Sequence, residues 1–312
     1  MKSNKEIKKI KLASRSSALA KYQCIKVLNI LLKKGYHKPS IKYLITSGDR
    51  LSYDLFKKNG GKGLFTKEID QLVISKKVDI GVHSLKDIPG IIDKNITIGA
   101  VFSEEDARDV LVTKNMNIEN IKDLPVNSTF ASSSPRRIAF IKNLRPDILV
   151  KPLRGNVKTR IKKINNGYAE STILALAGLK RLNLKNYLLF PISINQIIPS
   201  PGQGIIALVH RKDNFFAHNI CKKIDDQRTR IRVNAERAFL KKIGGDCNTA
   251  LAAYAEITGN NLVLRTKIFS QDSQKCLSEV VSGTLNESIK IGKNCAQLLL
   301  EKGAKKLLTS NE

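Results

Sequence analysis

A short polar segment that follows an apolar strand is the first candidate for chemistry. Val78, Ile80 and Val82 alternate with polar or small residues, which is the period-two pattern of a strand. The chain then continues through Lys86 and Asp87 and meets a proline. Ligands in open α/β sheets bind beyond the carboxyl ends of strands, so this position is favourable for a site. We take the carboxylate of Asp87 as the candidate centre, although most Lys–Asp pairs in such a place are solvated turn residues.

Arginine residues recur in the turns that lead from a predicted strand into a helix. If the strands are parallel, five of these residues converge on one rim: Arg136, Arg137, Arg154, Arg160 and Arg181. A guanidinium group binds a carboxylate through two hydrogen bonds, which lysine cannot do. The set therefore predicts a ligand rich in carboxylate groups. One solvated arginine at each helix start is the alternative, and it is weaker for five residues than for one.

Two further segments near the N-terminus have the composition of anion-binding turns. Arg15 and Ser17 lie between a predicted strand at 10–13 and a predicted helix at 18–33, whose N-terminus offers free N–H groups. Ordinary N-capping by serine explains this pattern equally well. The basic, glycine-rich segment 58–63 lacks the spacing of a P-loop. We expect it to be a mobile loop that brings Lys58 and Lys62 over an acidic ligand.

Cys247 differs from the other cysteines because it is predicted to lie on a loop. The other four occur in apolar segments or beside aromatic residues, where cysteine is usually inert. Their number and spacing predict neither a disulfide framework nor a metal site. A thiol on a loop can serve as a nucleophile or an attachment point, although the sequence pattern alone does not favour such a role for Cys247.

The elements that must position these residues predict an α/β fold with two lobes, a central cleft and a small third domain. Strands and helices alternate before and after the charged run at 104–109, which indicates two mostly parallel sheets. The last strand of the second lobe is expected at 172–177. A Pro- and Gly-rich segment at 199–204 then returns the chain to the first sheet, as in periplasmic binding proteins. Three alternating strands and a closing helix predict an α+β domain. The expected boundaries are 1–104 with 204–222, 109–199, and 226–312.

The charge of the chain restricts its partners. Lys and Arg total 55 against 27 acidic residues, a net charge of +28, which favours a polyanionic partner. A general richness in Lys, Ile and Asn accounts for part of this surplus. A nucleic-acid-binding protein is one alternative, but aromatic residues are 5% of the chain, Trp is absent, and the aromatic residues are not interleaved with the arginines. A two-lobed binding protein for an acidic solute is the other.

The compartment is predicted from what the sequence lacks. The first residues are rich in lysine but show no secretory signal, and no stretch has the roughly 18 apolar residues that a membrane span requires. The scattered cysteines indicate a reducing environment. We therefore expect a cytoplasmic protein without membrane contact.

Eight segments, in order, resemble the porphobilinogen deaminase family, also called hydroxymethylbilane synthase. They are ASRSSALA, GGKGLFTKEID, DIGVHSLKDIP, SSSPRR, LRGNVKTR, AGLKRL, PGQG and GGDCNTALAAYAE. No single segment is decisive, but eight in this order are highly specific, and they span nearly the whole chain beyond the first ten residues. The resemblance implies a transferase of haem biosynthesis. Such an enzyme joins four porphobilinogen units head to tail, with loss of ammonia, on a covalently bound dipyrromethane primer.

The resemblance also implies roles for individual residues. Asp87 corresponds to the catalytic aspartate and Cys247 to the thioether attachment point. The expected cofactor contacts are Lys86, Asp87, Ser133, Ser134, Arg136 and Arg137, and the expected substrate contacts are Arg15, Ser17, Lys62, Arg154, Arg160 and Arg181. The family resemblance implies a monomer. No metal is expected, and hand-over of the product to the next enzyme of the pathway is a further prediction, which the sequence itself does not address. The chain departs from the commonest pattern at Asp246, where many members have glycine.

Overall fold

The first lobe is built on a sheet whose parallel and antiparallel parts come from different stretches of the chain. The computed structural model describes residues 9–36, 39–50, 63–103, 105–115, 117–182, 189–245 and 249–309. In lobe 1, β1 (Lys11–Arg15) pairs in parallel with β2 (Ser40–Leu44) and β3 (Ile80–Ser84). β10 (Ile205–Arg211) inserts between β3 and β4 (Ile96–Ser103), antiparallel to both. The predicted return strand is confirmed, and it makes the sheet mixed.

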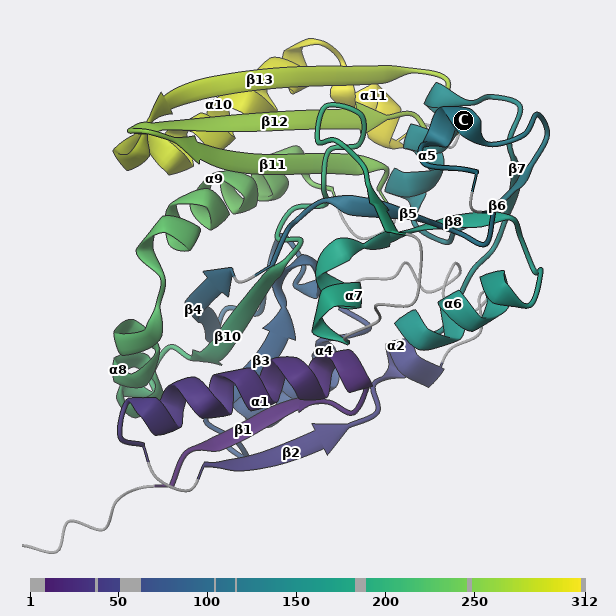
Figure 1. Cartoon of the computed structure of the whole chain (residues 1–312). Helices are drawn as coiled ribbons and strands as arrows, with labels where there is room; N and C mark the ends of the chain where they lie inside the picture. The colour runs from purple at the N-terminus through teal and green to yellow at the C-terminus, as the bar shows by residue number, and fades with distance from the viewer. Residues whose placement is uncertain are drawn as a thin grey trace, which may run out of the picture.

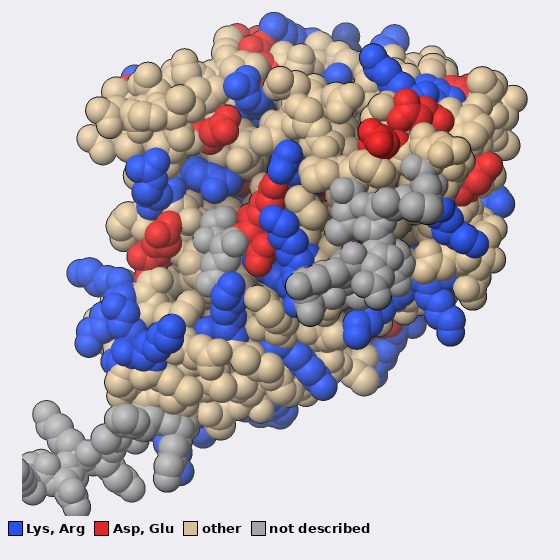
Figure 2. All heavy atoms as spheres, viewed as in Figure 1, with Lys and Arg blue, Asp and Glu red and all other residues tan. Residues whose placement is uncertain are grey.

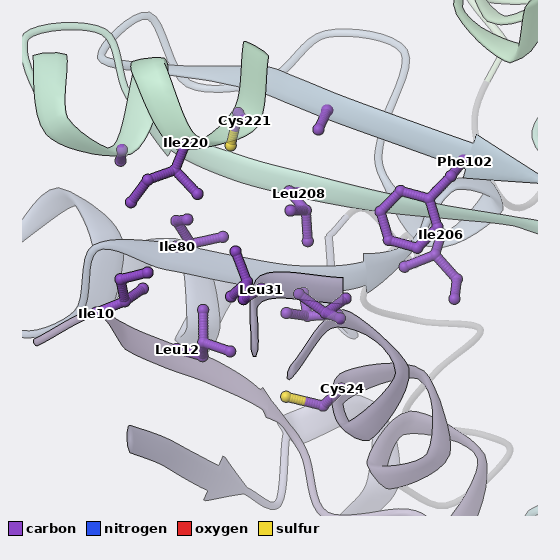
Figure 3. Close-up of a cluster of buried hydrophobic side chains, with 14 residues drawn as sticks. Ile10, Leu12, Cys24, Leu31, Ile80, Phe102, Ile206, Leu208, Ile220 and Cys221 are labelled. Atoms are coloured by element: carbon purple, nitrogen blue, oxygen red, sulfur yellow. The ribbon is translucent and has the colours of Figure 1, made fainter. Parts of the chain in front are cut away.

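Helices cover both faces of this sheet because each presents an apolar stripe. On one face, α1 (Ala18–Lys33) and α8 (Phe215–Ile224) bury a cluster that includes Cys24, Leu31 and Cys221 (Figure 3). On the other face, α4 (Lys67–Ile74) packs against the strands together with the long helix α9 (Gln227–Ile243). The predicted bounds of α1 are confirmed. A short helix, α2 (Ser47–Arg50), follows β2, and the 3-10 turn η1 (Leu85–Asp87) follows β3.

The second lobe repeats this pattern of pairing. Its sheet has the order β7-β6-β8-β5-β9. β6 (Thr129–Ala131) is parallel to β7 (Leu149–Lys151) and β8 (Ser171–Ala175), whereas β5 (Asp109–Thr113) is antiparallel to β8 and β9 (Leu189–Pro191). α5 (Pro135–Leu144), α6 (Val157–Asn165) and the 3-10 turn η2 (Ile121–Asp123) complete the described part of the lobe, together with a helix after β8.

That last helix corrects a prediction. The strand expected at 172–177 ends at Ala175, and α7 (Leu176–Arg181) begins at the next residue. Leu176 and Leu179 of α7 are buried against β5 and α6. A short apolar run fits a buried strand and a buried helix equally well, so hydrophobic periodicity could not place this boundary.

The third domain is the predicted meander covered by helices. β11 (Leu251–Thr258), β12 (Asn261–Phe269) and β13 (Cys276–Thr284) pair antiparallel in this order. After the 3-10 turn η3 (Leu285–Glu287), α10 (Ser288–Glu301) packs against α9, and α11 (Ala304–Thr309) follows. Phe269 lies edge-on to Phe140 of α5, with 4.8 Å between ring centroids, so this domain shares a core with lobe 2. Figure 1 shows lobe 1 at the bottom, lobe 2 at the right and the third domain at the top, beside α5 of lobe 2. The predicted fold class is confirmed.

The two segments that connect the lobes pack directly against each other. Gly204 has a φ of +85°, and a Cβ at this position would lie 2.9 Å from the carbonyl oxygen of Glu105. A side chain is excluded by both the conformation and the contact. The glycine of the Pro- and Gly-rich segment therefore brings the connecting segments together beneath the cleft.

Candidate functional site

A cavity of about 250 Å³ lies where the two lobes, a connecting segment and the third domain meet. It is the predicted central cleft. Most of the predicted site residues line it: Lys86, Asp87, Ser133, Ser134, Arg136, Arg137, Arg154 and Arg160. Asp87 is the one carboxylate among the described lining residues. Five cationic side chains therefore surround a single acid.

Asp87 is placed by the end of β3, as the sequence predicted. The strand runs into η1, whose last residue is Asp87, and the side chain stays about a quarter exposed. The Nη1 atom of Arg15 lies 3.5 Å from Oδ2 of Asp87. Arg15 also bonds to Asp49 and lies over the ring of Phe65, at 4.4 Å from its centroid. Arg15 is thus held beside Asp87 although it does not line the cavity.

The turn that carries Asp87 is fixed from the third domain's side by a residue that sequence reasoning missed. Arg237 of α9 donates hydrogen bonds to the carbonyl oxygens of Ile88 (2.9 Å), Pro89 (2.6 Å) and Gly90 (3.2 Å). Burial lowers the pKa of Arg237 to about 10. The sequence pattern around Arg237 contains no signal that points to this turn.

Lys86 is half-buried and faces a neutral partner. Its Nζ atom donates a hydrogen bond of 3.4 Å to Oε1 of Gln203. Burial, followed by the neighbouring charge of Arg137, lowers the pKa of Lys86 to about 8. The charge of this side chain therefore changes within the physiological range, which makes its anion binding sensitive to pH.

The first turn of α5 presents two arginines because its serines form the start of the helix. Ser134 caps α5 by accepting from the N–H of Arg137, and Ser133 accepts from the N–H of Leu153 at 3.0 Å. Both arginines are more than nine-tenths buried. The serine hydroxyls that were expected to contact ligand thus already bond to the backbone, and they shape the turn that holds Arg136 and Arg137.

A buried carboxylate behind these arginines is the second residue that the sequence did not reveal. Asp109, the first residue of β5, is fully buried and lies 2.7 Å from Nη2 of Arg136 and 2.8 Å from Nη2 of Arg137. Burial alone would raise the pKa of Asp109, but the two arginines hold it well below its usual range. Nε2 of Gln203 donates to the same carboxylate at 2.9 Å.

Arg160 reaches the cavity from α6. Asn156 caps this helix by accepting from the N–H of Thr159, and Nε of Arg160 donates to the carbonyl oxygen of Gly155 at 2.8 Å. Burial, together with the nearby charges of Arg137 and Arg154, lowers the pKa of Arg160 to about 10. Its cationic form is destabilised in the cleft, so an anionic ligand would stabilise that form.

Other predicted site residues lie elsewhere. Arg181 does not join the rim: it is buried and donates to the carbonyl oxygen of Gly204 at 2.7 Å, although it borders a second cavity of about 80 Å³ with Lys86. It turns inward because α7 replaces the expected end of the strand. Ser17 caps α1 by accepting from the N–H of Ala20 at 3.4 Å. Lys58, Lys62 and Cys247 lie outside the described residues.

Within the described ranges, no three His, Cys, Asp or Glu side chains gather as metal ligands would. None of the helices in the described ranges has the length and apolarity of a bilayer-spanning segment. Basic side chains are spread over the whole face shown in Figure 2 and do not form one stripe.

The fold and the site define the class: a two-lobed α/β protein with a third domain and a cleft suited to polycarboxylate ligands. The sequence profile "Porphobilinogen deaminase, dipyromethane cofactor binding domain" matches residues 10–219, and "Porphobilinogen deaminase, C-terminal domain" matches 230–301. The porphobilinogen deaminase of Oceanobacillus iheyensis is 37% identical, covering 97% of each chain. That of Rickettsia typhi is 40% identical, covering 94% of this chain and 99% of its own.

This chain belongs to the porphobilinogen deaminase family. It is a transferase of tetrapyrrole biosynthesis that polymerises porphobilinogen and uses a dipyrromethane cofactor. Solved structures resemble it more distantly. The VFT2 domain of BvgS from Bordetella pertussis has a TM-score of 0.45 at 13% identity, covering 69% of this chain and 85% of that domain. A periplasmic binding protein of Salmonella typhimurium with high arginine specificity has a TM-score of 0.41 at 13% identity, covering 70% of this chain and 93% of that protein.

Proposed function

We propose that the reaction takes place in the cavity between the lobes, with Asp87 as its catalytic residue. The observation that carries this proposal is the position of Asp87, which is the one acid among the described lining residues and lies beside five cations. Porphobilinogen bears carboxylates at its edge and an aminomethyl group at the reacting carbon. Its carboxylates can pair with the cationic side chains, and the carboxylate of Asp87 can stabilise the positive charge that develops at its reacting carbon.

Asp87 acts by stabilising positive charge. The amine of porphobilinogen is already protonated near neutral pH, so no acid is needed for ammonia to leave. The departing ammonia leaves a cationic methylene-pyrrolenine, and a carboxylate held beside that cation lowers the barrier. Asp87 also accepts hydrogen bonds from pyrrole N–H groups, and removal of a proton is its secondary role.

Lys86 and the arginines bind carboxylates. Each porphobilinogen unit brings two carboxylate groups, so negative charge in the cleft grows with every addition. Guanidinium groups bind such groups in a fixed geometry. We assign Arg136 and Arg137 to the cofactor, with Ser133 and Ser134, and Arg15, Arg154 and Arg160 to substrate. Ser17, Lys62 and Arg181 keep their proposed substrate roles from the family resemblance.

The residues present fit the dipyrromethane group. Most of the polar side chains that line the cavity in the described ranges are hydrogen-bond donors, and Nε of Arg137 is buried without a hydrogen-bond partner among the described residues. When bound, the cofactor supplies the pyrrole carbon to which the first unit is joined. We propose Cys247 as its attachment point. In support, Thr249 and Leu251, just beyond Cys247 in the chain, line the cavity.

The remaining proposals concern the whole chain. We propose lobe 1 at 1–104 with 204–222, lobe 2 at 109–199 and the third domain at 226–312. We also propose that the protein is a cytoplasmic monomer that can hand its product to the next enzyme. These proposals rest on the family resemblance and on the pattern of the sequence.

Turnover of porphobilinogen by the purified chain tests the proposed function. We expect ammonia and hydroxymethylbilane to form in a ratio of about four to one, as head-to-tail joining of four units requires. Porphobilinogen recovered unchanged after prolonged incubation would instead support a binding protein for an acidic solute. A salt-dependent gel shift with nucleic acid at physiological ionic strength would support the other alternative.

A further inference from the structure

The buried carboxylate of Asp109 connects three of the cations that line the cleft. Oδ2 of Asp109 pairs with Arg136, and Oδ1 of Asp109 pairs with Arg137. Oδ1 also accepts from Nε2 of Gln203, whose Oε1 atom accepts from Lys86. Asp109 is fully buried and Gln203 is 3% exposed. Asp109 therefore lies behind the cavity wall, and Gln203, which lines the cavity, connects it to Lys86.

The orientation of the Gln203 amide follows from its surroundings. Nε2 faces two acceptors, the carbonyl oxygen of Ala107 at 2.7 Å and the carboxylate of Asp109. Oε1 faces the ammonium group of Lys86. The reverse orientation would place the NH₂ group against a cation and the oxygen against two acceptors. Gln203 thus links Asp109 to Lys86, because its amide donates a hydrogen bond to the first and accepts one from the second.

The cations need such an anchor because they repel one another. Arg136 and Arg137 are adjacent in sequence, and both face Lys86, Arg154 and Arg160 across the same cavity. A second bond fixes Arg136, whose Nη1 atom donates to the carbonyl oxygen of Ile198 at 2.8 Å. Guanidinium groups that are fixed in advance bind carboxylates without first losing conformational freedom.

We propose that Asp109 and Gln203 are positioning residues for the anion site: Asp109 holds Arg136 and Arg137, and Gln203 extends this constraint to Lys86. This inference rests on the proposed function of the cleft. Neither side chain needs to touch the reacting atoms. Their effect appears in how fast and at what pH the protein takes up its anionic cofactor.

The test is the rate at which cofactor-free full-length protein gains mass on addition of porphobilinogen. Asp109→Asn keeps the volume but removes the charge, and its NH₂ group, placed away from the two donors at Oδ1, faces Arg136. We expect loading at least tenfold slower than in the unsubstituted chain. Gln203→Leu leaves both arginine pairs in place and releases Lys86, so we expect a smaller decrease, about threefold, with normal folding.

The pH profile separates positioning from a merely structural role. The carboxylates of Asp87 and Asp109 favour the charged form of Lys86, and the guanidinium groups of Arg137 and Arg136 disfavour it. Arg160 and Arg181 border the smaller cavity together with Lys86. Without the charge of Asp109, the pKa of Lys86 falls. The decline of loading with rising pH should therefore begin at lower pH in Asp109→Asn, which a loss of stability alone would not cause.

Asp147→Asn is the matched control. Asp147 pairs with Arg145 at the other end of α5, away from the cavity. We expect normal loading and a normal pH profile in this variant. Wild-type loading and pH dependence in both Asp109→Asn and Gln203→Leu would overturn the proposal while the function stands. If Asp109→Asn does not fold, Gln203→Leu decides. If the unsubstituted chain gains no mass, the proposed function itself falls, and this inference falls with it.

Discussion

Asp87 differs from every other described side chain that lines the cavity, because it alone carries negative charge. We expect Asp87→Asn to keep its cofactor and to lose kcat by about 10²–10³-fold, the size of effect seen when one charge-stabilising group is removed. Asn preserves the volume but replaces one acceptor oxygen with a donor, so the loss reports the negative charge together with that acceptor. Cofactor content by mass and turnover of porphobilinogen should be measured on the same preparation. Retention of most of the kcat would contradict the assigned role.

Lys86 gives the cleft a dependence on pH. With a pKa of about 8, Lys86 is cationic below that pH and becomes neutral above it. Its attraction for carboxylates is therefore present below about pH 8 and lost as the pH rises further. We expect cofactor loading by the cofactor-free protein to slow between about pH 7 and about pH 9. Lys86→Arg should remove this decline, since guanidinium stays charged. Identical profiles in the two proteins would show that another group titrates.

At the residue scale, the sequence predicted which side chains meet but not what holds them. Lys86, Asp87 and four of the arginines were found because they follow strands or open helices. Asp109 lies within a run of charged residues that is typical of an exposed connection, and its burial depends on the return of the chain at Gln203, almost a hundred residues later. Arg181 was expected on the rim and turns inward for a similar reason, since its partner is the backbone of Gly204.

At the scale of elements, strong hydrophobic periodicity was sufficient to predict where a helix or strand lies. The pattern of α1 gave its bounds because its apolar residues recur every three or four positions, and the meander was found from its alternation. The start of α7 was missed because the unbroken run of apolar and small residues from Ile173 to Leu179 carries no period. Tertiary packing against β5 and α6 decides that boundary.

Two adjacent leucines of α1 test how this helix contributes to stability. Leu31 is fully buried in the core of lobe 1, and Leu32, one residue further along the helix, is 46% exposed to solvent. We expect Leu31→Ala to cost about 2–5 kcal/mol of unfolding free energy and Leu32→Ala less than about 0.5 kcal/mol. Urea unfolding followed by circular dichroism measures both. Equal costs would contradict the orientation of α1 on the sheet.

At the scale of the whole molecule, a net charge of +28 surrounds a cleft that takes acidic ligands. Such a field should attract porphobilinogen from solution, and salt should screen it. We expect kcat/KM to fall several-fold between about 0.05 M and about 0.5 M KCl, with kcat changing less. Steady-state kinetics with potassium chloride and with sucrose of equal osmolarity separate screening from general solution effects. A kcat/KM that does not change with salt would assign the charge to another role.

The measurement that tests the central claim most directly is intact mass with peptide mapping around Cys247, made on the purified chain and on Cys247→Ser. The account predicts an excess mass equal to two condensed pyrrole units on the peptide that contains Cys247, already present or appearing when porphobilinogen is added. Cys247→Ser should fold, carry no such mass and show little turnover. A chain that gains no mass with porphobilinogen, or a Cys247→Ser variant with normal activity, would contradict it.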